Sequence, residues 1–175
     1  MLIREICGKN LFGSGSSRLG SPTHEYTNRP ITIMLKLPQT LQETINAHGV
    51  TAFPYEGCGL LLGRIENEDN IVVALHPAQN SWPVEAEKPE RFQISGADML
   101  QAELAAMDQD LEVIGVFHSH PNHPPIASPR DLAWASWPGY SYLITEIRDG
   151  QPRQSRSWQL TTDRTDFVEE IVEII

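Results

Sequence analysis

The segment Leu111–Phe117 constrains the fold more than any other part of this sequence. Its residues, Leu-Glu-Val-Ile-Gly-Val-Phe, form the most apolar and β-branched run in the chain. Such a run is typical of a strand that is buried on both faces, because a half-exposed strand would alternate polar with apolar residues. We therefore expect Leu111–Phe117 to be a central strand of a β-sheet.

The segments around this run predict an α/β (α+β) fold. A helix is expected over 38–48, with a proline at its start and Gly49 just past its end, and a second helix is expected after Ser95 as its cap. Residues 167–175 fit a helix or an edge strand, and we favour the strand. Further strands are expected at 31–37, 59–65, 71–75, 91–94, 140–147 and 156–160. This order predicts a mixed, curved sheet flanked by helices.

The first 30 residues differ from the rest of the chain. Gly13-Ser14-Gly15-Ser16-Ser17 and Gly20-Ser21-Pro22 have the composition of a linker and carry no apolar periodicity. We expect 1–30 to be a disordered or linker-like extension and 31–175 to be a single domain. A chain of 175 residues suits one domain with a substantial core.

The charge balance and the cysteine count limit the classes of partner and compartment. The chain carries 23 acidic and 13 basic residues, a net charge of -10, which argues against nucleic acid as a partner. No run of 18 apolar residues is present, so we expect no membrane span, and no signal peptide is recognised. Cys7 and Cys58 cannot make a disulfide framework, and we expect the protein to be cytoplasmic.

Two histidines follow the central strand at a spacing that suits a metal ion. His118 and His120 are two residues apart, and side chains at that spacing share one face of a strand. Two imidazole nitrogens on one face can bind a single zinc ion. A lone His-x-His pair is also common without any metal, and His123 nearby fits a solvated loop residue as well as a third ligand.

Ser128 and Asp131 supply a candidate third ligand. Ser128 followed by Pro129 is a strong helix start, and Asp131 shares a helix face with Ser128. Two histidines, an aspartate and one open position would be the pattern of a catalytic zinc site. The same Ser-x-x-Asp spacing equally fits a capping box that serves only the helix backbone.

The residues His118-x-His120, Ser128 and Asp131 together resemble the motif of the JAMM (MPN+) metalloproteases. Glu56 and the Gly-rich apolar segment after it are similar to the upstream glutamate element of that family. Further segments that resemble the short prokaryotic members are Asn80-Ser81-Trp82, Pro89-Glu90-Arg91-Phe92, Trp137-Pro138 and Ser141-Tyr142-Leu143-Ile144. The resemblance covers about residues 31–175 and implies an MPN/JAMM-like architecture, which is similar to that of cytidine deaminases.

This resemblance assigns a role to each matched residue. It implies that His118, His120 and Asp131 bind one Zn²⁺ per chain. It also implies that Glu56 is the general base toward the water molecule on the zinc and that Ser128 stabilises the tetrahedral oxyanion. Ser119 points to the opposite strand face, so we expect its hydroxyl to be structural.

The substrate class follows only from the family. The resemblance implies a peptidase that hydrolyses a peptide or isopeptide bond after the C-terminal Gly-Gly tail of a ubiquitin-fold, sulfur-carrier-like protein or its conjugate. We expect the loop 81–89 to help hold that tail in an extended conformation. The alternative is a non-catalytic MPN scaffold that binds ubiquitin-like proteins. The sequence leaves open the leaving group and the oligomeric state.

Overall fold

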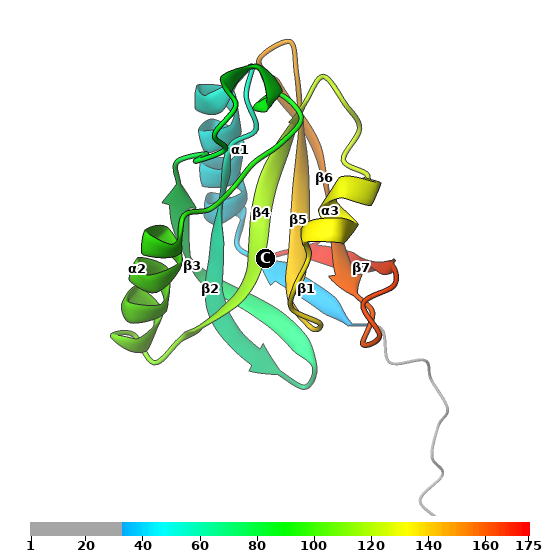
Figure 1. Cartoon of the computed structure of the whole chain (residues 1–175). Helices are drawn as coiled ribbons and strands as arrows, with labels where there is room; N and C mark the ends of the chain where they lie inside the picture. Colours follow the sequence, from blue (N-terminus) through cyan, green and yellow to red (C-terminus); the bar gives the residue numbers. More distant parts are fainter. Residues whose placement is uncertain (1–32) are drawn as a thin grey trace, which may run out of the picture. The chain divides into compact units, whose positions relative to one another are not determined.

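The computed structural model describes residues 33–175 (Figure 1). Residues 1–32 lie outside the described part, so the extension 1–30 and the domain boundary after it stay predictions. The strands are β1 (Met34–Leu37), β2 (Cys58–Glu66), β3 (Asp69–Ala78), β4 (Glu112–Pro121), β5 (Ser141–Arg148), β6 (Gln151–Leu160) and β7 (Phe167–Ile174). The helices are α1 (Gln39–Ala52), the 3₁₀ helix η1 (Glu85–Glu87), α2 (Gly96–Met107) and α3 (Pro129–Trp134).

The strands of the described residues form one mixed sheet that closes on itself. Their order is β1-β3-β2-β4-β5-β6-β7, and β1 pairs in parallel with both β3 and β7. The central strand β4 is antiparallel to β2 and parallel to β5. The prediction of a mixed, curved sheet flanked by helices is therefore confirmed, and the curvature goes as far as closure.

The strand β4 is apolar because both of its faces are covered. Val116 belongs to a buried cluster with Ala102 and Ala106 of α2, whereas Phe117 belongs to a second cluster with Ile45 of α1. In Figure 1, α1 lies behind the sheet and α2 lies beside β2 and β3. Burial on both faces removes the polar alternation that an exposed face would require, as the sequence of this strand predicted.

Two local predictions are wrong. The helix α1 does not end before Gly49 but continues to Ala52, and Gly49 is buried inside it. A Cβ atom on Gly49 would lie 3.0 Å from the side chain of Ile147, so the glycine serves close packing of α1 on β5 rather than a helix end. Residues 91–94 form no strand, because their main chain bonds chiefly to Asn80 and Ser81.

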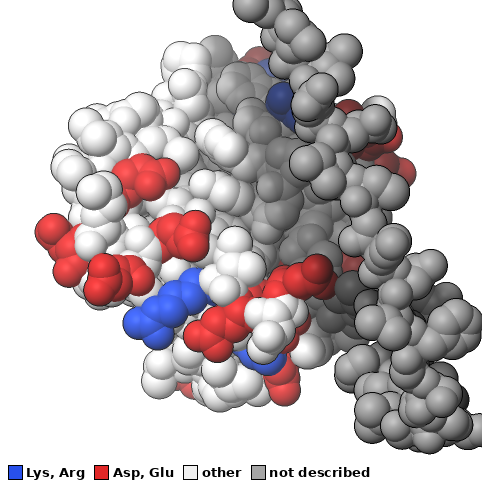
Figure 2. Space-filling view, turned by 90° about the horizontal axis from the view of Figure 1, so that it is seen from below, with Lys and Arg blue, Asp and Glu red and all other residues white. Residues whose placement is uncertain are grey.

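Among residues 33–175, no helix is both long enough and apolar enough to cross a membrane. The face seen in Figure 2 carries more acidic than basic side chains, and the acidic ones are spread over its left and lower parts and its right edge. This distribution agrees with the net charge of -10 for the whole chain. A phosphate backbone would be repelled from such a face.

Candidate metal centre

The two histidines of β4 face each other. His118 and His120 are both buried, and their Nε2 atoms lie 3.1 Å apart. The prediction that the pair shares one strand face is therefore confirmed. Their position within the last four residues of β4 brings them to the edge of the sheet where α3 begins.

Asp131 approaches both imidazoles from the first turn of α3. Its Oδ1 lies 3.3 Å from His118 Nε2, and its Oδ2 lies 3.8 Å from His120 Nε2. The same carboxylate accepts a hydrogen bond of 2.6 Å from the main-chain N–H of Ser128, whose Oγ accepts one of 3.2 Å from Asp131 N. Asp131 thus serves the capping box and also faces the histidines, so the two interpretations of the Ser-x-x-Asp spacing are compatible.

Glu56 joins this group through the pairing of β2 with β4. Cys58 lies opposite His118, and the pairing continues through two hydrogen bonds of 2.9 Å between Gly57 and Ser119. One of them runs from Gly57 N–H to Ser119 Oγ, as expected of a structural hydroxyl. Glu56, the next residue along, is buried, and its carboxylate lies within 4.8 Å of both imidazoles.

Contacts behind the histidines hold the rings in place. His120 Nδ1 lies 2.8 Å from the carbonyl oxygen of Pro124, which can only accept, so Nδ1 carries the proton and Nε2 keeps a free lone pair. His118 Nδ1 has no hydrogen-bond partner within residues 33–175. The ring of Phe92 stacks on the His118 ring instead, with centroids 4.6 Å apart and planes at 26°.

Burial and neighbouring charges shift the four titratable groups in the metal-free protein. Burial raises the pKa of Glu56 to about 8, and burial with the charge of His118 lowers the pKa of His120 to about 4. Burial opposes ionisation of Asp131 and His118, but each favours the charged form of the other. Their attraction therefore lowers the pKa of Asp131 and raises that of His118.

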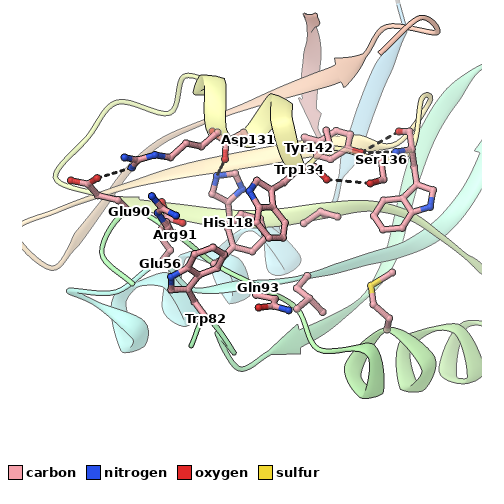
Figure 3. Close-up of a pocket in the computed structure, with 17 residues that line it drawn as sticks. Glu56, Trp82, Glu90, Arg91, Gln93, His118, Asp131, Trp134, Ser136 and Tyr142 are labelled. Atoms are coloured by element: carbon pink, nitrogen blue, oxygen red, sulfur yellow. Dashed lines mark hydrogen bonds and ion pairs between the residues drawn. The ribbon is translucent and has the colours of Figure 1, made fainter. Parts of the chain in front are cut away.

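The cluster lies where two hollows meet. A cleft of about 320 Å³ is lined by Glu56, His118 and Asp131 and continues to Trp137 and Tyr142 (Figure 3). A second, more open hollow of about 480 Å³ is lined by Glu56, His120 and Ser128 together with several prolines. Glu56 borders both hollows, so a chain that passed from one into the other would cross the carboxylate and the imidazoles.

These residues fit a divalent metal ion. The Nε2 atoms of His118 and His120 lie 3.1 Å apart inside a buried site beside the carboxylates of Asp131 and Glu56. Without a metal, a proton on His118 Nε2 can join the two rings by a hydrogen bond; with a metal in place of that proton, both nitrogens can offer their lone pairs to the ion. Imidazole and carboxylate ligands suit zinc and also other transition metals, so the donor set selects a class of ion rather than one element.

The structure thus brings together all five residues that the sequence singled out. His123 is exposed. Among the described residues, the side chains whose ligand atoms all lie within 4.8 Å of one another are Glu56, His118 and His120. Asp131 lies outside this group, as His123 does, but its carboxylate is 3.3 and 3.8 Å from the two Nε2 atoms. Sequence reasoning assigned no role to Phe92, Trp82 or Trp134, although all three line the cleft. Trp82 and Phe92 lie within segments that resemble the family, but no spacing rule connects them with the histidines.

Comparison with known proteins supplies a family. The sequence profile of the family described as prokaryotic homologs of the JAB domain matches residues 38–161. A solution structure of a protein from Desulfitobacterium hafniense superposes with a TM-score of 0.71 and 30% identity, covering 81% of this chain and 93% of that one. The profile match includes every residue of the metal centre.

Two curated relatives carry functional names. The desampylase of Haloferax volcanii is 35% identical over 91 residues, which are 52% of this chain and 62% of that protein. The probable TtuB-protein conjugate cleaving protease of Thermus thermophilus is 33% identical over 106 residues, 60% of this chain and 66% of that protein. The chain therefore spans less than two thirds of the length of the curated relatives that it matches.

Proposed function

The chain belongs to the family of prokaryotic homologs of the JAB domain, as its resemblance to the JAMM metalloproteases predicted, and from this membership we propose that it is a zinc-dependent peptidase. The observation that carries the proposal is the buried cluster in which the Nε2 atoms of His118 and His120 face each other beside two carboxylates. A scaffold would have no reason to keep such a costly set of buried ionisable groups.

In this proposal His118, His120 and Asp131 hold one Zn²⁺, and Glu56 and Ser128 are the catalytic residues. When bound, zinc supplies Lewis-acid chemistry: it polarises a carbonyl group and makes water more acidic. Glu56 accepts the proton of the attacking water and delivers it to the leaving amine. Ser128 Oγ accepts a bond from Asp131 N, and its hydroxyl also helps to lower the pKa of the Asp131 carboxylate. In this proposal the hydroxyl hydrogen turns from that carboxylate to bond the developing oxyanion.

We propose that the substrate is a ubiquitin-fold, sulfur-carrier-like protein, cleaved after its C-terminal Gly-Gly tail. The names of the two curated relatives support this class, since one is a desampylase and the other is named for cleaving TtuB-protein conjugates. We also propose a cytoplasmic location, which the low cysteine count of the chain supports.

An extended tail could pair with the segment 91–94. The main-chain atoms of Arg91 and Gln93 bond toward Asn80 and Ser81, whereas within residues 33–175 no hydrogen bond involves the main chain of Phe92. Main-chain groups that point away from the loop offer an edge for an added strand.

The loop 81–89 is expected to help hold the tail. Replacing 81–89 by Gly-Ser residues should raise KM and leave the zinc content unchanged. Unaltered kinetics would count against a role for the loop 81–89.

The first test of the peptidase proposal is the variant Glu56→Gln, measured with a Gly-Gly-tailed sulfur carrier fused to a reporter peptide. Loss of a general base should lower kcat by roughly 10²- to 10⁴-fold. Zinc per chain should stay at the wild-type value, since the ligands are intact. Glu66→Gln, at the exposed far end of β2, is the matched control and should cleave normally.

Two outcomes would contradict the proposal in different ways. Cleavage by Glu56→Gln at the wild-type rate would exclude Glu56 as the base. A zinc-loaded wild type that binds the sulfur carrier without cleaving it would favour the scaffold alternative.

A further inference from the structure

Two tryptophans join the walls of the cleft beside the metal centre. Trp82 comes from the loop before η1, and Trp134 is the last residue of α3. Their rings meet edge to face, with centroids 5.4 Å apart and planes at 73°. We call this pair the tryptophan bridge. Both rings line the cleft, so a chain that follows the cleft must pass them.

Trp82 is held firmly in this position. Its indole Nε1–H donates a hydrogen bond of 2.9 Å to Glu87, and its main-chain N–H donates one of 3.0 Å to the side chain of Asn80. The guanidinium of Arg91 lies 5.1 Å from the centre of its ring. A change of the Trp82 rotamer would break the hydrogen bond to Glu87 and the contact with Arg91. The Trp82 side of the bridge is therefore preorganised.

The other side of the bridge is tied to the metal centre. Trp134 lies three residues after Asp131 on the short helix α3, so the two side chains share a face that looks into the cleft. A second contact also joins the walls, because Arg130 NH1 lies 2.7 Å from Glu90 Oε2. Both contacts span the walls beside the histidines, but Trp134 is 60% exposed and the Arg130–Glu90 pair lies in solvent, so Trp82 is the more firmly held side of the bridge.

The tryptophan bridge lines the cleft close to the metal centre. In Figure 3, Trp134 lies beside His118 in the view and Trp82 below it, with Glu56 on one side and Ser136 and Tyr142 on the other. The cleft continues beyond the bridge toward Trp137 and Met99, which line its apolar end. In the proposed function, a tail that reaches the metal centre from this end passes the two rings with its last residues.

We infer that the tryptophan bridge is the element that restricts the residues just before the cleaved bond to glycine. Glycine has no Cβ atom and permits the closest approach of a peptide backbone to fixed walls. A methyl group at the same place would have to part the two rings or lift the tail from the floor of the cleft. The inference rests on the proposed function for the identity of the tail, and it makes Trp82 and Trp134 specificity-determining residues.

The apolar cleft, rather than the proline-lined hollow, is assigned to the tail for a physical reason. The tail is the constant part of every substrate, whereas the leaving group varies. A narrow aromatic cleft suits a constant partner, and the more open hollow beside Ser128 and His123 accommodates a variable one. Phe92 lines the same cleft, and its ring stacks on that of His118.

The test measures binding and does not depend on catalysis. The probes are the hexapeptide acetyl-Ser-Leu-Thr-Leu-Gly-Gly and its counterpart ending in Ala-Gly, titrated into the zinc-loaded full chain by calorimetry. One added methyl group in a fitted site typically costs roughly 10- to 200-fold, so wild type should prefer Gly-Gly by at least about 10-fold. In Trp134→Ala the ratio of the two dissociation constants should fall toward one.

Two further variants distinguish the loss of the tryptophan bridge from a general loss of stability or zinc binding. Trp134→Phe keeps an aromatic edge against Trp82 and should keep most of the preference. Met107→Ala, on the exposed outer face of α2, lies outside the cleft and should behave as wild type. Circular dichroism and zinc content should be unchanged in each variant.

The inference is overturned if wild type binds both peptides equally, if Trp134→Ala keeps the full preference, or if neither peptide binds. Cleavage of the intact fusion is measured in parallel. Normal cleavage with an unchanged preference in Trp134→Ala would refute the role of the bridge and leave the peptidase proposal standing. A preference that collapses in Trp134→Ala without cleavage by wild type would support the bridge and refute the peptidase.

Discussion

Replacement of Asp131 by alanine separates the two roles that the structure gives this side chain. Asp131 accepts a hydrogen bond from Ser128 N and also faces the Nε2 atoms of both histidines at 3.3 and 3.8 Å. The chain contains a natural control, because Ser95 and Asp98 start α2 at the same Ser-x-x-Asp spacing. Within residues 33–175, Asp98 makes no ion pair with a histidine, whereas Asp131 lies beside both Nε2 atoms. Asp98→Ala should therefore disturb a helix start without affecting metal binding.

The expected magnitudes differ between the two variants. Loss of an N-terminal capping contact costs about 1 kcal/mol, which lowers Tm by about 3 °C in a chain of this size. Both variants should show this loss without metal. Zinc at 100 times its dissociation constant stabilises the folded protein by about 2.7 kcal/mol, or about 8 °C. Wild type and Asp98→Ala should gain this increment, and Asp131→Ala should gain little of it.

The assay is thermal unfolding of the chelator-treated and the zinc-reconstituted proteins, with zinc per chain determined by elemental analysis. One zinc per chain is expected in wild type and Asp98→Ala, and much less in Asp131→Ala. If Asp131→Ala bound one zinc and gained the full increase in Tm, Asp131 would be a helix cap only. The assignment of the ligands would then have to turn to Glu56 with the two histidines.

Three other predictions concern residues around the centre. Ser119→Ala leaves the buried N–H of Gly57 without its partner, so the free energy of unfolding in urea titrations should fall by about 1–3 kcal/mol. The variant should also have a lower kcat at unchanged zinc content. Unchanged stability and rate would show that Ser119 does not position Glu56. Cys58 is buried with its pKa raised to about 12, so in a Cys7→Ser background a thiol reagent should label it only after unfolding, and rapid labelling of the folded protein would contradict this burial. In the metal-free protein, burial raises the pKa of Glu56 from 4.5 to about 8, so the folded state retains a proton that the unfolded chain loses. The stabilisation that protonated Glu56 contributes is therefore complete below about pH 4.5, and a few kcal/mol of it are lost as the pH rises to 8. Glu56→Gln should show a flatter profile of Tm against pH over this range. Identical profiles for the variant and wild type would refute the shifted pKa.

Several features of the fold and the site were predictable because they depend on local patterns. The double burial of β4 is visible in its unbroken apolar run, and the strand period of two places His118 and His120 on one face. The start of α3 at Ser128 follows from capping chemistry alone. Gly49 was misjudged because a glycine near a helix end resembles a terminator, and only the packing of α1 against Ile147 reveals its use.

The sequence by itself therefore determined the strand that carries the histidines, the helix that carries Asp131 and, through resemblance, the family. The tertiary structure decided which other side chains surround the histidines and Asp131. Glu56 is one glutamate among many in the sequence, and it reaches the histidines because β2 pairs with β4 in a register that sets Cys58 opposite His118. Trp82 and Trp134 are 52 residues apart in the numbering and meet at 5.4 Å only because a loop and a short helix form opposite walls of one cleft. Contacts between segments so far apart depend on sheet register and packing, which no local periodicity encodes.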